Sequence, residues 1–541
     1  MTTRNILIAV AGILSITIFL IYTNPKDSSE TVDLLDSFLN EQWETIKNDT
    51  QVVAFVQNRE AIANTPHRPL YHFSAPMGRI HDPNGLCQWQ GNYHLFYQYI
   101  DTDPNTEGIR WGHAYSEDLL TWKDLPVAIS PTIEQSSFSG QTLAEEDRVI
   151  AMWHGLRVGN MIATSNDPLL LDWEPNPNNP VIPMKNKQGD YQVFDPCIWK
   201  QNDGYYYSLS GSYKNGVVGK DCTGEVQAFR SKDLNDWEWI GPMFTDSLLS
   251  EPGEDMVVPN FWPVGSGKHL LLCFSHKRAG RGYVGTYDPE AVSFEADYHF
   301  RANHSVRADR KGGLRAINSG VHAPSATVDE SGRYVAVFNM CDYKEQDGWS
   351  GLMTLPRVYS LAEDNSLRVN PIKELENLRF NWQEVASREL PSDQEIKLES
   401  IKGKAIEIRV VIEPRQAKEV GLKVLQSPSD SEYTVISFKE NKISINNEHS
   451  SNNPEIKHRP EEAGELILEQ DESLQLRIFI DRSVVEVFAN ERQVCSMRVF
   501  PTQESASGVS LFSRGGKAKL LSLEAWQMKS VWPELAFKEG K

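Results

Sequence analysis

A short pattern recurs five times in the middle of this chain, and it limits the folds that the chain can adopt. In each copy a run of mostly aromatic and apolar residues follows a turn signal. The runs begin at residues 93, 149, 205, 269 and 334, spaced by 56, 56, 64 and 65 residues. A Pro or Gly stands nine or ten residues before each run, at Pro83, Gly140, Pro196, Pro259 and Pro324. A repeat of this length with several strands per copy indicates radial repetition, so the sequence predicts a five-bladed β-propeller.

A second motif keeps the same register in three of the copies. It is Ser-x-Asp followed by Trp, and it runs over residues 116–122, 165–173 and 231–237. No helical periodicity lies between the strand-like runs, which argues against a βαβ array. Each copy is therefore expected to hold two strands joined by a tight turn and a longer excursion that closes near a Trp.

Strand patterns continue beyond these copies, and the chain as a whole is predicted to be all-β. Alternating apolar segments separated by Asn, Asp, Gly and Ser turns predict a β-sandwich over residues 383–535. The propeller is expected over residues 67–375, and residues 28–66 are expected to form a linker with short helices. Within the sandwich, Asp481-Arg482-Ser483 is expected to form a turn or an ion pair between the domains rather than a reactive site.

Residues 1–27 have the features of an export signal or membrane anchor. Residues 6–22 form an uncharged apolar run of 17 residues, and Arg4 precedes it. That length just suffices to cross a membrane, and it also suits a long signal peptide. A single N-terminal anchor and a cleaved signal both stay open. Either would export the body of the chain, so an extracellular or periplasmic location, or attachment to the outer face of a membrane, is expected.

Charge and cysteine usage exclude several classes of function. Lys and Arg number 54 against 74 Asp and Glu, a net charge of −20, so no nucleic-acid partner is expected. The six cysteines form no Cys-x-x-Cys pair and stand at no zinc-like spacing with His, so they predict no metal site.

Equivalent positions of a propeller repeat lie together around the central axis, and here several of them are acidic. The residues directly before the recurring Pro or Gly are Asp82, Ser139, Asp195, Val258 and Ala323. A further acidic pair, Glu254 and Asp255, precedes the fourth of these positions. The symmetry therefore predicts that acids from the first, third and fourth copies face one mouth of the channel. A calcium site would draw its ligands from one segment, so paired carboxylates for glycoside cleavage are favoured over metal binding.

Side chains suited to sugar binding are expected near the same end of the repeat. Amides and hydroxyls hydrogen-bond to sugar hydroxyls, and aromatic rings pack on the apolar faces of sugars. The candidate substrate-binding residues are Asn84, Gln98, Trp111, Phe138, Ser139 and Asp255. Two of them have a structural alternative, because Trp111 could fill the core of a blade and Asn84-Gly85 could form a turn.

Several longer motifs, in this order along the chain, resemble glycoside hydrolase family 32, the family of invertases, levanases, inulinases and related fructosyltransferases. They are residues 68–73, His81-Asp82-Pro83-Asn84-Gly85, residues 96–99, Trp111-Gly112-His113, Phe138-Ser139-Gly140, Asp195-Pro196, Pro259-Asn260-Phe261, Leu355-Pro356-Arg357 and residues 479–490. The resemblance implies a five-bladed propeller followed by a β-sandwich. It also implies retaining hydrolysis of β-fructofuranosyl bonds in sucrose or in fructans such as levan and inulin, without a cofactor.

The resemblance also implies roles for single residues. Asp82 matches the nucleophile of the family, which would form a fructosyl ester, and Asp195 matches the residue that binds fructose hydroxyls and stabilises the transition state. The family takes its acid/base from a Glu-Cys-Pro motif, but Val257 occupies that position here. Glu254, three residues earlier, is expected to replace it, with Asp255 as the alternative.

Three more departures from the family pattern bear on function. Phe194 stands where the family usually has Arg, His81 where it usually has Asn, and His322 where Tyr is common. Loss of the Arg removes a charge that would lower nearby carboxylate pKa values. A propeller that binds glycans without cleaving them therefore stays open beside hydrolysis, as does transfer of fructose to another sugar. The sequence leaves the oligomeric state open.

Overall fold

The computed structural model describes residues 39–103, 105–244, 250–302, 304, 307–308, 314–315, 320–341, 348–456 and 458–532. The apolar run at residues 6–22 lies outside the described residues, so the expected export signal is not described. Among the helices of the described ranges, none combines the length and the hydropathy that a membrane span requires.

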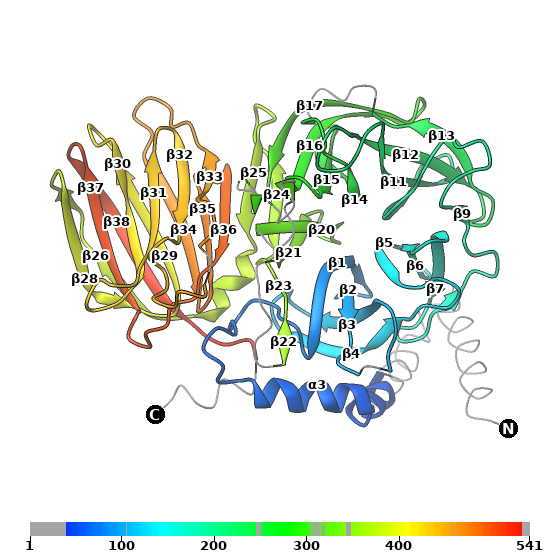
Figure 1. The fold of residues 1–541 in the computed structure, drawn as a ribbon, viewed down its shortest axis with the longest axis horizontal. Helices are drawn as coiled ribbons and strands as arrows, with labels where there is room; N and C mark the ends of the chain where they lie inside the picture. The colour runs from blue at the N-terminus through cyan, green and yellow to red at the C-terminus, as the bar shows by residue number, and fades with distance from the viewer. Residues whose placement is uncertain are drawn as a thin grey trace, which may run out of the picture.

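Five sheets follow one another along the chain, each built on four antiparallel strands in chain order (Figure 1). The first contains β1 (Gly78–Trp89), β2 (Asn92–Ile100), β3 (Arg110–Ser116) and β4 (Trp122–Ile129), with β22 (Trp349–Ser350) parallel to β1. The second contains β5 (Ser137–Ala144), β6 (Val149–Gly155), β7 (Gly159–Ser165) and β8 (Glu174–Pro175), with β9 (Ile182–Pro183) also on β7.

The remaining three sheets repeat this order. The third contains β10 (Pro196–Lys200), β11 (Tyr206–Lys214), β12 (Thr223–Ser231) and β13 (Glu238–Pro242), and the fourth contains β14 (Val257–Gly265), β15 (Lys268–Ser275), β16 (Ala279–Asp288) and β17 (Ser293–Arg301). The fifth contains β20 (Gly320–Val328), β21 (Tyr334–Cys341), β24 (Arg357–Leu361) and β25 (Leu367–Pro371), with β23 (Leu352–Met353) on β21. A separate small hairpin joins β18 (Arg307–Ala308) to β19 (Leu314–Arg315).

The first strands of the five sheets close into a ring. β1 contacts β5, β5 contacts β10, β10 contacts β14, β14 contacts β20, and β20 contacts β1 again. Figure 1 shows the sheets arranged radially around this ring. The five runs that defined the sequence repeat are the second strands of the sheets. Radial repetition, predicted from the spacing alone, is confirmed.

The recurring Pro or Gly lies in the first strand of every sheet, and it marks an irregularity. The pairing register of β1 shifts between Ile80 and Pro83, which leaves Asp82 out of the regular ladder. The register of β5 shifts in the same way between Ser137 and Gly140, around Ser139. Similar shifts lie between Val257 and Asn260 in β14, around Pro259, and between Val321 and Pro324 in β20, and β10 begins at its Pro. Such bulges change the direction of a side chain. In β1 and β5 the side chains concerned are those of Asp82 and Ser139.

The Ser-x-Asp…Trp motif has a structural role. In each of its three copies the Trp indole donates to the carbonyl of a Leu in the turn between the third and fourth strands, over 2.9–3.1 Å. Those three leucines, Leu119, Leu170 and Leu234, have positive φ angles of 65°, 51° and 68°. The motif therefore closes a tight turn between the third and fourth strands in each of these three blades.

The second domain is a sandwich of two antiparallel sheets that pack on a core of Ile, Leu and Val. One sheet contains β26 (Arg379–Val385), β27 (Arg388–Leu390), β38 (Ala518–Met528), β29 (Ala405–Glu413), β34 (Leu474–Asp481), β35 (Val484–Ala489) and β36 (Gln493–Arg498). The other contains β28 (Gln394–Lys402), β37 (Gly508–Arg514), β30 (Glu419–Gln426), β31 (Thr434–Lys439), β32 (Lys442–Asn446) and β33 (Glu462–Glu465).

Short helical segments flank the propeller, and one of them spans residues 39–47. The 3-10 helix η1 (Lys373–Leu378) links β25 to the sandwich, and helix α3 (Thr50–Ala61) precedes the first blade. Asp49 caps α3, because its side chain accepts hydrogen bonds from the backbone N–H groups of Gln51 and Val52. The helix lies along the outer strand β4 of the first blade (Figure 1).

Buried polar groups and one apolar cluster hold the two domains together. The apolar cluster includes Phe73 and Leu355 beside Phe479 and Phe488 of the sandwich. Asp481 accepts from the backbone N–H groups of residues 70, 71 and 72, over 2.6–3.0 Å. These contacts confirm the structural role expected for the motif at residues 481–483.

Candidate active site

Asp82 lies at the register shift within β1 and is held by three neutral donors. Its Oδ2 accepts from Ser139 Oγ at 2.7 Å and from Gln98 Nε2 at 3.4 Å, and its Oδ1 accepts from Asn339 Nδ2 at 2.8 Å. Gln98 also donates to Ser139 Oγ at 2.6 Å, so the three side chains form one network. Burial raises the pKa of Asp82, although the Ser139 hydrogen bond and the charges of His81 and His276 oppose that rise. Asp82 is thus fixed in position without a cation bonded to it.

Asp195 lies directly before β10, and it shares the electrostatic environment of Asp82. The side chain is buried, with 9% of its surface exposed. Burial and the charge of Asp82 raise the pKa of Asp195 to about 7. Its neighbour Phe194 stacks parallel to Tyr213 at a ring separation of 6.0 Å, and it supplies no positive charge. The two aspartates that the repeat predicted to converge therefore lie within electrostatic reach of each other.

Asp255 and His276 complete this group of charges from the fourth blade. Asp255 Oδ2 lies 2.5 Å from His276 Nδ1, and Asp255 Oδ1 accepts from the backbone N–H of His276 at 2.8 Å. The charge of Asp255 raises the pKa of Asp195 further, and the charge of His276 lowers it. Carboxylates from the first, third and fourth blades thus meet near the propeller axis, together with one histidine.

Glu254 lies in a different environment from its neighbour. Its side chain is fully buried, and its carboxylate accepts from Arg281 at 2.8 Å and from Arg301 at 2.9 and 3.2 Å. The backbone N–H of Glu251 donates to it at 2.8 Å. Burial by itself would raise the pKa of Glu254, but the charges and hydrogen bonds of the two arginines lower it. Such a group is a poor proton donor near neutral pH.

Val257, at the position where the family has its acid/base, is enclosed by apolar groups. It packs with Val258, Phe274 and Ala323, and Phe194 lies against the same cluster. The side chain is 3% exposed. This position contributes no proton-transferring group, and the neighbouring cluster is apolar as well.

The sequence-predicted substrate-binding residues divide into two groups. Gln98 and Ser139 contact Asp82 directly, and Phe138, which is half buried, lies 6.3 Å from the ring of His154. Asn84 and Trp111 are fully buried. Trp111 packs between Phe96 and Trp153, and its indole donates to the carbonyl of Phe138 at 2.8 Å. Trp111 therefore supports the site from the blade core instead of presenting a face to a sugar, because its ring completes the core between the first two blades.

Two residues of the site carried no signal in the sequence analysis. Asn339 lies in β21, the second strand of the fifth blade, and His276 is the first residue after β15. His276 could have been found from the repeat, because the end of each second strand reaches the same mouth as the start of each first strand. Within the described ranges, no group of three or more His, Cys, Asp or Glu side chains is arranged to hold a metal ion.

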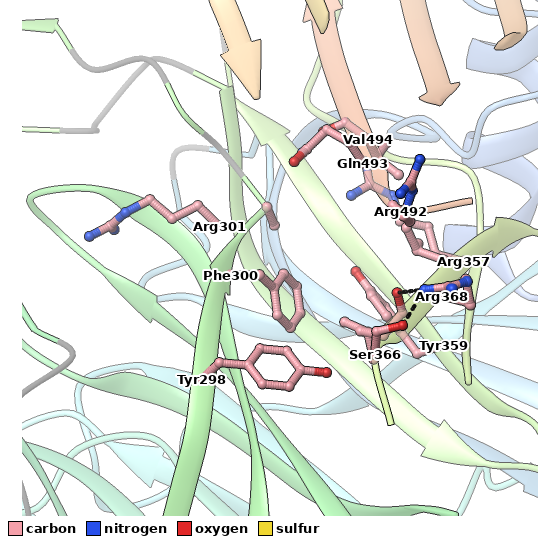
Figure 2. A pocket seen from close by; sticks show the side chains of 13 residues that line it. Tyr298, Phe300, Arg301, Arg357, Tyr359, Ser366, Arg368, Arg492, Gln493 and Val494 are labelled. Atoms are coloured by element: carbon pink, nitrogen blue, oxygen red, sulfur yellow. Dashed lines mark hydrogen bonds between the residues drawn. The ribbon is translucent and has the colours of Figure 1, made fainter. Parts of the chain in front are cut away.

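A cavity of about 370 Å³ lies at the junction of the propeller and the sandwich (Figure 2), and its lining residues do not include Asp82, Asp195 or Asp255. Its walls include Tyr298, Phe300 and Tyr359 from the propeller and residues 492–494 from the sandwich. Figure 2 shows the guanidinium of Arg301 pointing away from Arg368. That guanidinium binds Glu254, so the cavity wall and the buried ion pairs share one side chain.

A propeller that gathers carboxylates at its axis and carries a β-sandwich has the architecture and site of a glycosidase. The chain matches the N-terminal domain of glycosyl hydrolases family 32 over residues 72–371 and the C-terminal domain of that family over residues 374–527. The chain therefore belongs to glycosyl hydrolases family 32. The resemblance read from the motifs is confirmed, and so is the expectation of a glycosidase.

Named relatives of this chain act on several fructosides. It is 26% identical to a sucrose-6-phosphate hydrolase of Zymomonas mobilis, over 86% of this chain and 92% of the relative. It is 27% identical to a fructan 6-exohydrolase of Beta vulgaris, over 86% and 87% of the two chains, and 27% identical to a levanase of Bacillus subtilis, over 87% and 72%.

Solved structures share the fold. The crystal structure of fructan 1-exohydrolase IIa from Cichorium intybus superposes with a TM-score of 0.74 at 22% identity, over 86% of this chain and 98% of that one. The exo-inulinase of Aspergillus awamori superposes with a TM-score of 0.71 at 20% identity, over 87% and 100% of the two chains. Both match the propeller followed by a sandwich described above.

Proposed function

We propose that this chain hydrolyses β-fructofuranosyl linkages in sucrose or fructans by a retaining double displacement. The observation that carries the proposal is the setting of Asp82, which three neutral donors fix at the propeller axis beside Asp195. Family membership and the fructoside-cleaving relatives support the substrate class. In this mechanism Asp82 attacks the anomeric carbon and forms a fructosyl ester, which water then cleaves.

The donors around Asp82 suit a nucleophile. Ser139, Gln98 and Asn339 orient both carboxylate oxygens but leave the negative charge without a bonded cation. A carboxylate neutralised by Arg would be less reactive toward carbon, because the ion pair stabilises the charge that must be donated. Asp195 adds a second buried carboxyl, which is placed to bind fructose hydroxyls and to stabilise positive charge developing on the ring.

We do not assign proton transfer to Glu254. Two arginines bind both of its oxygens, and its side chain is fully buried. A general acid must release its proton to the leaving oxygen and regain it in the next step. A carboxylate that stays ionised between two arginines neither releases nor regains a proton near neutral pH.

We further propose that the chain works outside the cytoplasm. The uncharged run at residues 6–22 after Arg4 supports export, by a cleaved signal or an uncleaved anchor. Expression of the full chain and of a form lacking residues 1–27, followed by cell fractionation, tests this. Export of the full chain alone is expected, and equal retention of both forms in the cytoplasm would contradict it.

Release of free fructose tests the proposed activity. The full chain is incubated with sucrose, levan and inulin, and fructose is measured against an Asp82→Asn control. Fructose release from at least one substrate, lowered about 10³-fold or more in the control, is the expected result. Binding of a fructan without any release would instead favour a glycan-binding propeller. New fructosyl oligosaccharides in place of free fructose would identify transfer to a sugar.

A further inference from the structure

We infer that His276, oriented by Asp255, is the proton donor and acceptor of this site, in place of the carboxylic acid that Val257 removes. The inference rests on the proposed fructosidase function and names the residue that completes it. It follows from the hydrogen bonds of His276 to Asp255 and from the exposed edge of its ring.

The backbone places His276 where a proton donor is needed. His276 is the first residue of the turn between β15 and β16, at the end of the blade where β14 begins. Asp255 lies just before β14 and binds both the backbone N–H and the ring Nδ1 of His276. Two contacts to one carboxylate fix the ring, since rotation about its side chain would break the shorter bond.

The second ring nitrogen is left for substrate. A carboxylate accepts hydrogen bonds, so the contact at 2.5 Å places a proton on Nδ1. Nε2 makes no hydrogen bond to any residue that the structure describes. The side chain is 44% exposed, so a sugar can reach it. Phe274 packs edge-on against the ring at 5.0 Å and limits its tilt.

The surrounding charges favour the protonated ring. Burial would lower the pKa of His276, but its hydrogen bond to Asp255 and the charges of Asp255, Asp195 and Asp82 raise it above the usual value of 6.5. The cations beside it in the turn are Lys277 and Arg278, and both pair with Glu251. His322 on β20 also packs against the ring of Phe274, at a ring separation of 5.2 Å. Asp255 therefore stabilises the imidazolium in the way that a paired acid supports a catalytic histidine.

The reaction balances with these groups alone. Asp82 bonds to the anomeric carbon while the bond from that carbon to the leaving oxygen breaks, and Nε2–H of His276 passes its proton to that oxygen. Neutral His276 then accepts a proton from water as the water oxygen attacks the same anomeric carbon, and the bond from that carbon to the Asp82 oxygen breaks. Fructose leaves, Asp82 is again a carboxylate, and His276 is again protonated.

Leaving-group dependence tests the role of His276. Sucrose needs protonation of its leaving oxygen, whereas an aryl β-fructofuranoside with an acidic phenol does not. In His276→Gln we expect hydrolysis of sucrose to fall about 10²- to 10⁴-fold. The first turnover of the aryl fructoside is expected to persist as a burst of phenol. Azide, which needs no general base, is expected to restore the steady rate and to yield fructosyl azide. His299→Gln, on the outer strand of the same blade, is the matched control and should match the unaltered chain.

A pH profile supplies a second test with a different variant. In the unaltered chain, kcat/KM for sucrose should fall at alkaline pH as His276 loses its proton. Asp255→Asn removes the charge that holds that proton, so the alkaline limb should move to lower pH. His276→Gln should lack this limb. Thermal unfolding of both variants establishes that they are folded.

Three outcomes separate the possibilities. Sucrose hydrolysis retained within threefold in folded His276→Gln overturns the role of His276. Equal loss of both substrates, without a burst or azide rescue, also overturns it and leaves His276 as a structural residue. If the unaltered chain releases no fructose from either substrate, the proposed fructosidase function fails, and this role fails with it.

Discussion

Two groups of buried carboxylates, one at the propeller axis and one between the domains, differ in the donors that surround them. At the domain interface Glu486 accepts from Arg357 at 2.8 Å, from Ser496 at 2.6 Å and from the backbone of Leu355 at 2.7 Å. Burial would raise its pKa, but Arg357 and His72 lower the pKa of Glu486 to about 2. At the axis, Asp82 has only neutral donors, and burial raises its pKa.

The histidines of the two groups differ in how many of their ring nitrogens contact an acid. His72 is fully buried, and both of its ring nitrogens face acids, with Nδ1 2.8 Å from Asp481 and Nε2 3.2 Å from Glu486. His276 has one nitrogen on Asp255 and the other free. A histidine with both nitrogens engaged fastens two elements together, whereas one with a free nitrogen can exchange a proton with a ligand.

The comparison shows that burial alone does not mark a reactive acid. Cations around Glu486, and around Glu254 as well, keep the carboxylate ionised and committed to structure. Neutral donors around Asp82 position the group and leave its charge available. Five substitutions can break or sharpen this distinction.

The largest effect is expected from Asp82→Asn. Activity should fall about 10³-fold or more, because the amide cannot form the ester. The free energy of unfolding should change little or increase, because the substitution removes a half-buried charge with no bonded cation. Fructose release and urea unfolding measure the two quantities. A large loss of stability with unchanged activity would show that Asp82 has a structural role and not a catalytic one.

Glu486→Gln is expected to show the opposite result. Removing the charge leaves Arg357 buried without its partner, so the free energy of unfolding should fall by roughly 3–5 kcal/mol. Activity measured well below the lowered melting temperature should stay within a few-fold of the unaltered chain. A variant as stable as the parent would show that the interface does not depend on this ion pair.

The pH dependence of stability should have opposite signs in the two groups. Asp195 has a pKa raised from 3.8 to about 7, so it favours the folded state below pH 3.8 and this contribution is lost as the pH rises to 7. Glu486 has a pKa lowered from 4.5 to about 2, so its contribution is present above pH 4.5 and is lost as the pH falls toward 2.

Asp195→Asn should therefore stabilise the chain at pH 8 by roughly 2–4 kcal/mol, with the gain vanishing near pH 4. Urea unfolding of this variant and of the parent at several pH values measures the difference. A gain in stability that is the same at every pH would show that burial does not raise the pKa of Asp195.

The smallest effects come from a matched pair of serines, each of which donates to one of the carboxylates. Ser139→Ala removes a bond that lowers the pKa of Asp82, so the acidic limb of kcat/KM should move to higher pH and activity should fall about 10-fold. Ser496→Ala should cost roughly 1.5 kcal/mol of stability and leave the pH profile unchanged. If Ser496→Ala changed the pH profile of activity, the distinction between the carboxylates at the axis and those at the domain interface would be wrong.

The repeat made the fold and the pair of aspartates predictable. Equivalent positions in a closed ring lie together, so the residues before each Pro or Gly had to converge, and Asp82 and Asp195 do. Asn339 could not be found in this way, because it lies in a second strand and no motif marks it. His276 also lacks a motif, and only a comparison of the ends of the second strands would have pointed to it.

The environment of Glu254 could not be read from sequence either. Its two partners, Arg281 and Arg301, stand 27 and 47 residues downstream on adjacent strands, and only the pairing of β16 with β17 brings them together. Trp111 was equally ambiguous, because a tryptophan that fills a blade core and one that faces a sugar have the same local pattern.

Detection of a covalent intermediate tests the central claim most directly. The chain is mixed with an activated aryl β-fructofuranoside, quenched in acid within the first turnovers and digested, and the peptide that contains Asp82 is weighed by mass spectrometry. The account predicts that this peptide gains the mass of one fructosyl group and that the gain disappears in Asp82→Asn. Steady release of fructose with no adduct on this peptide, and with the same rate in Asp82→Asn, would contradict it.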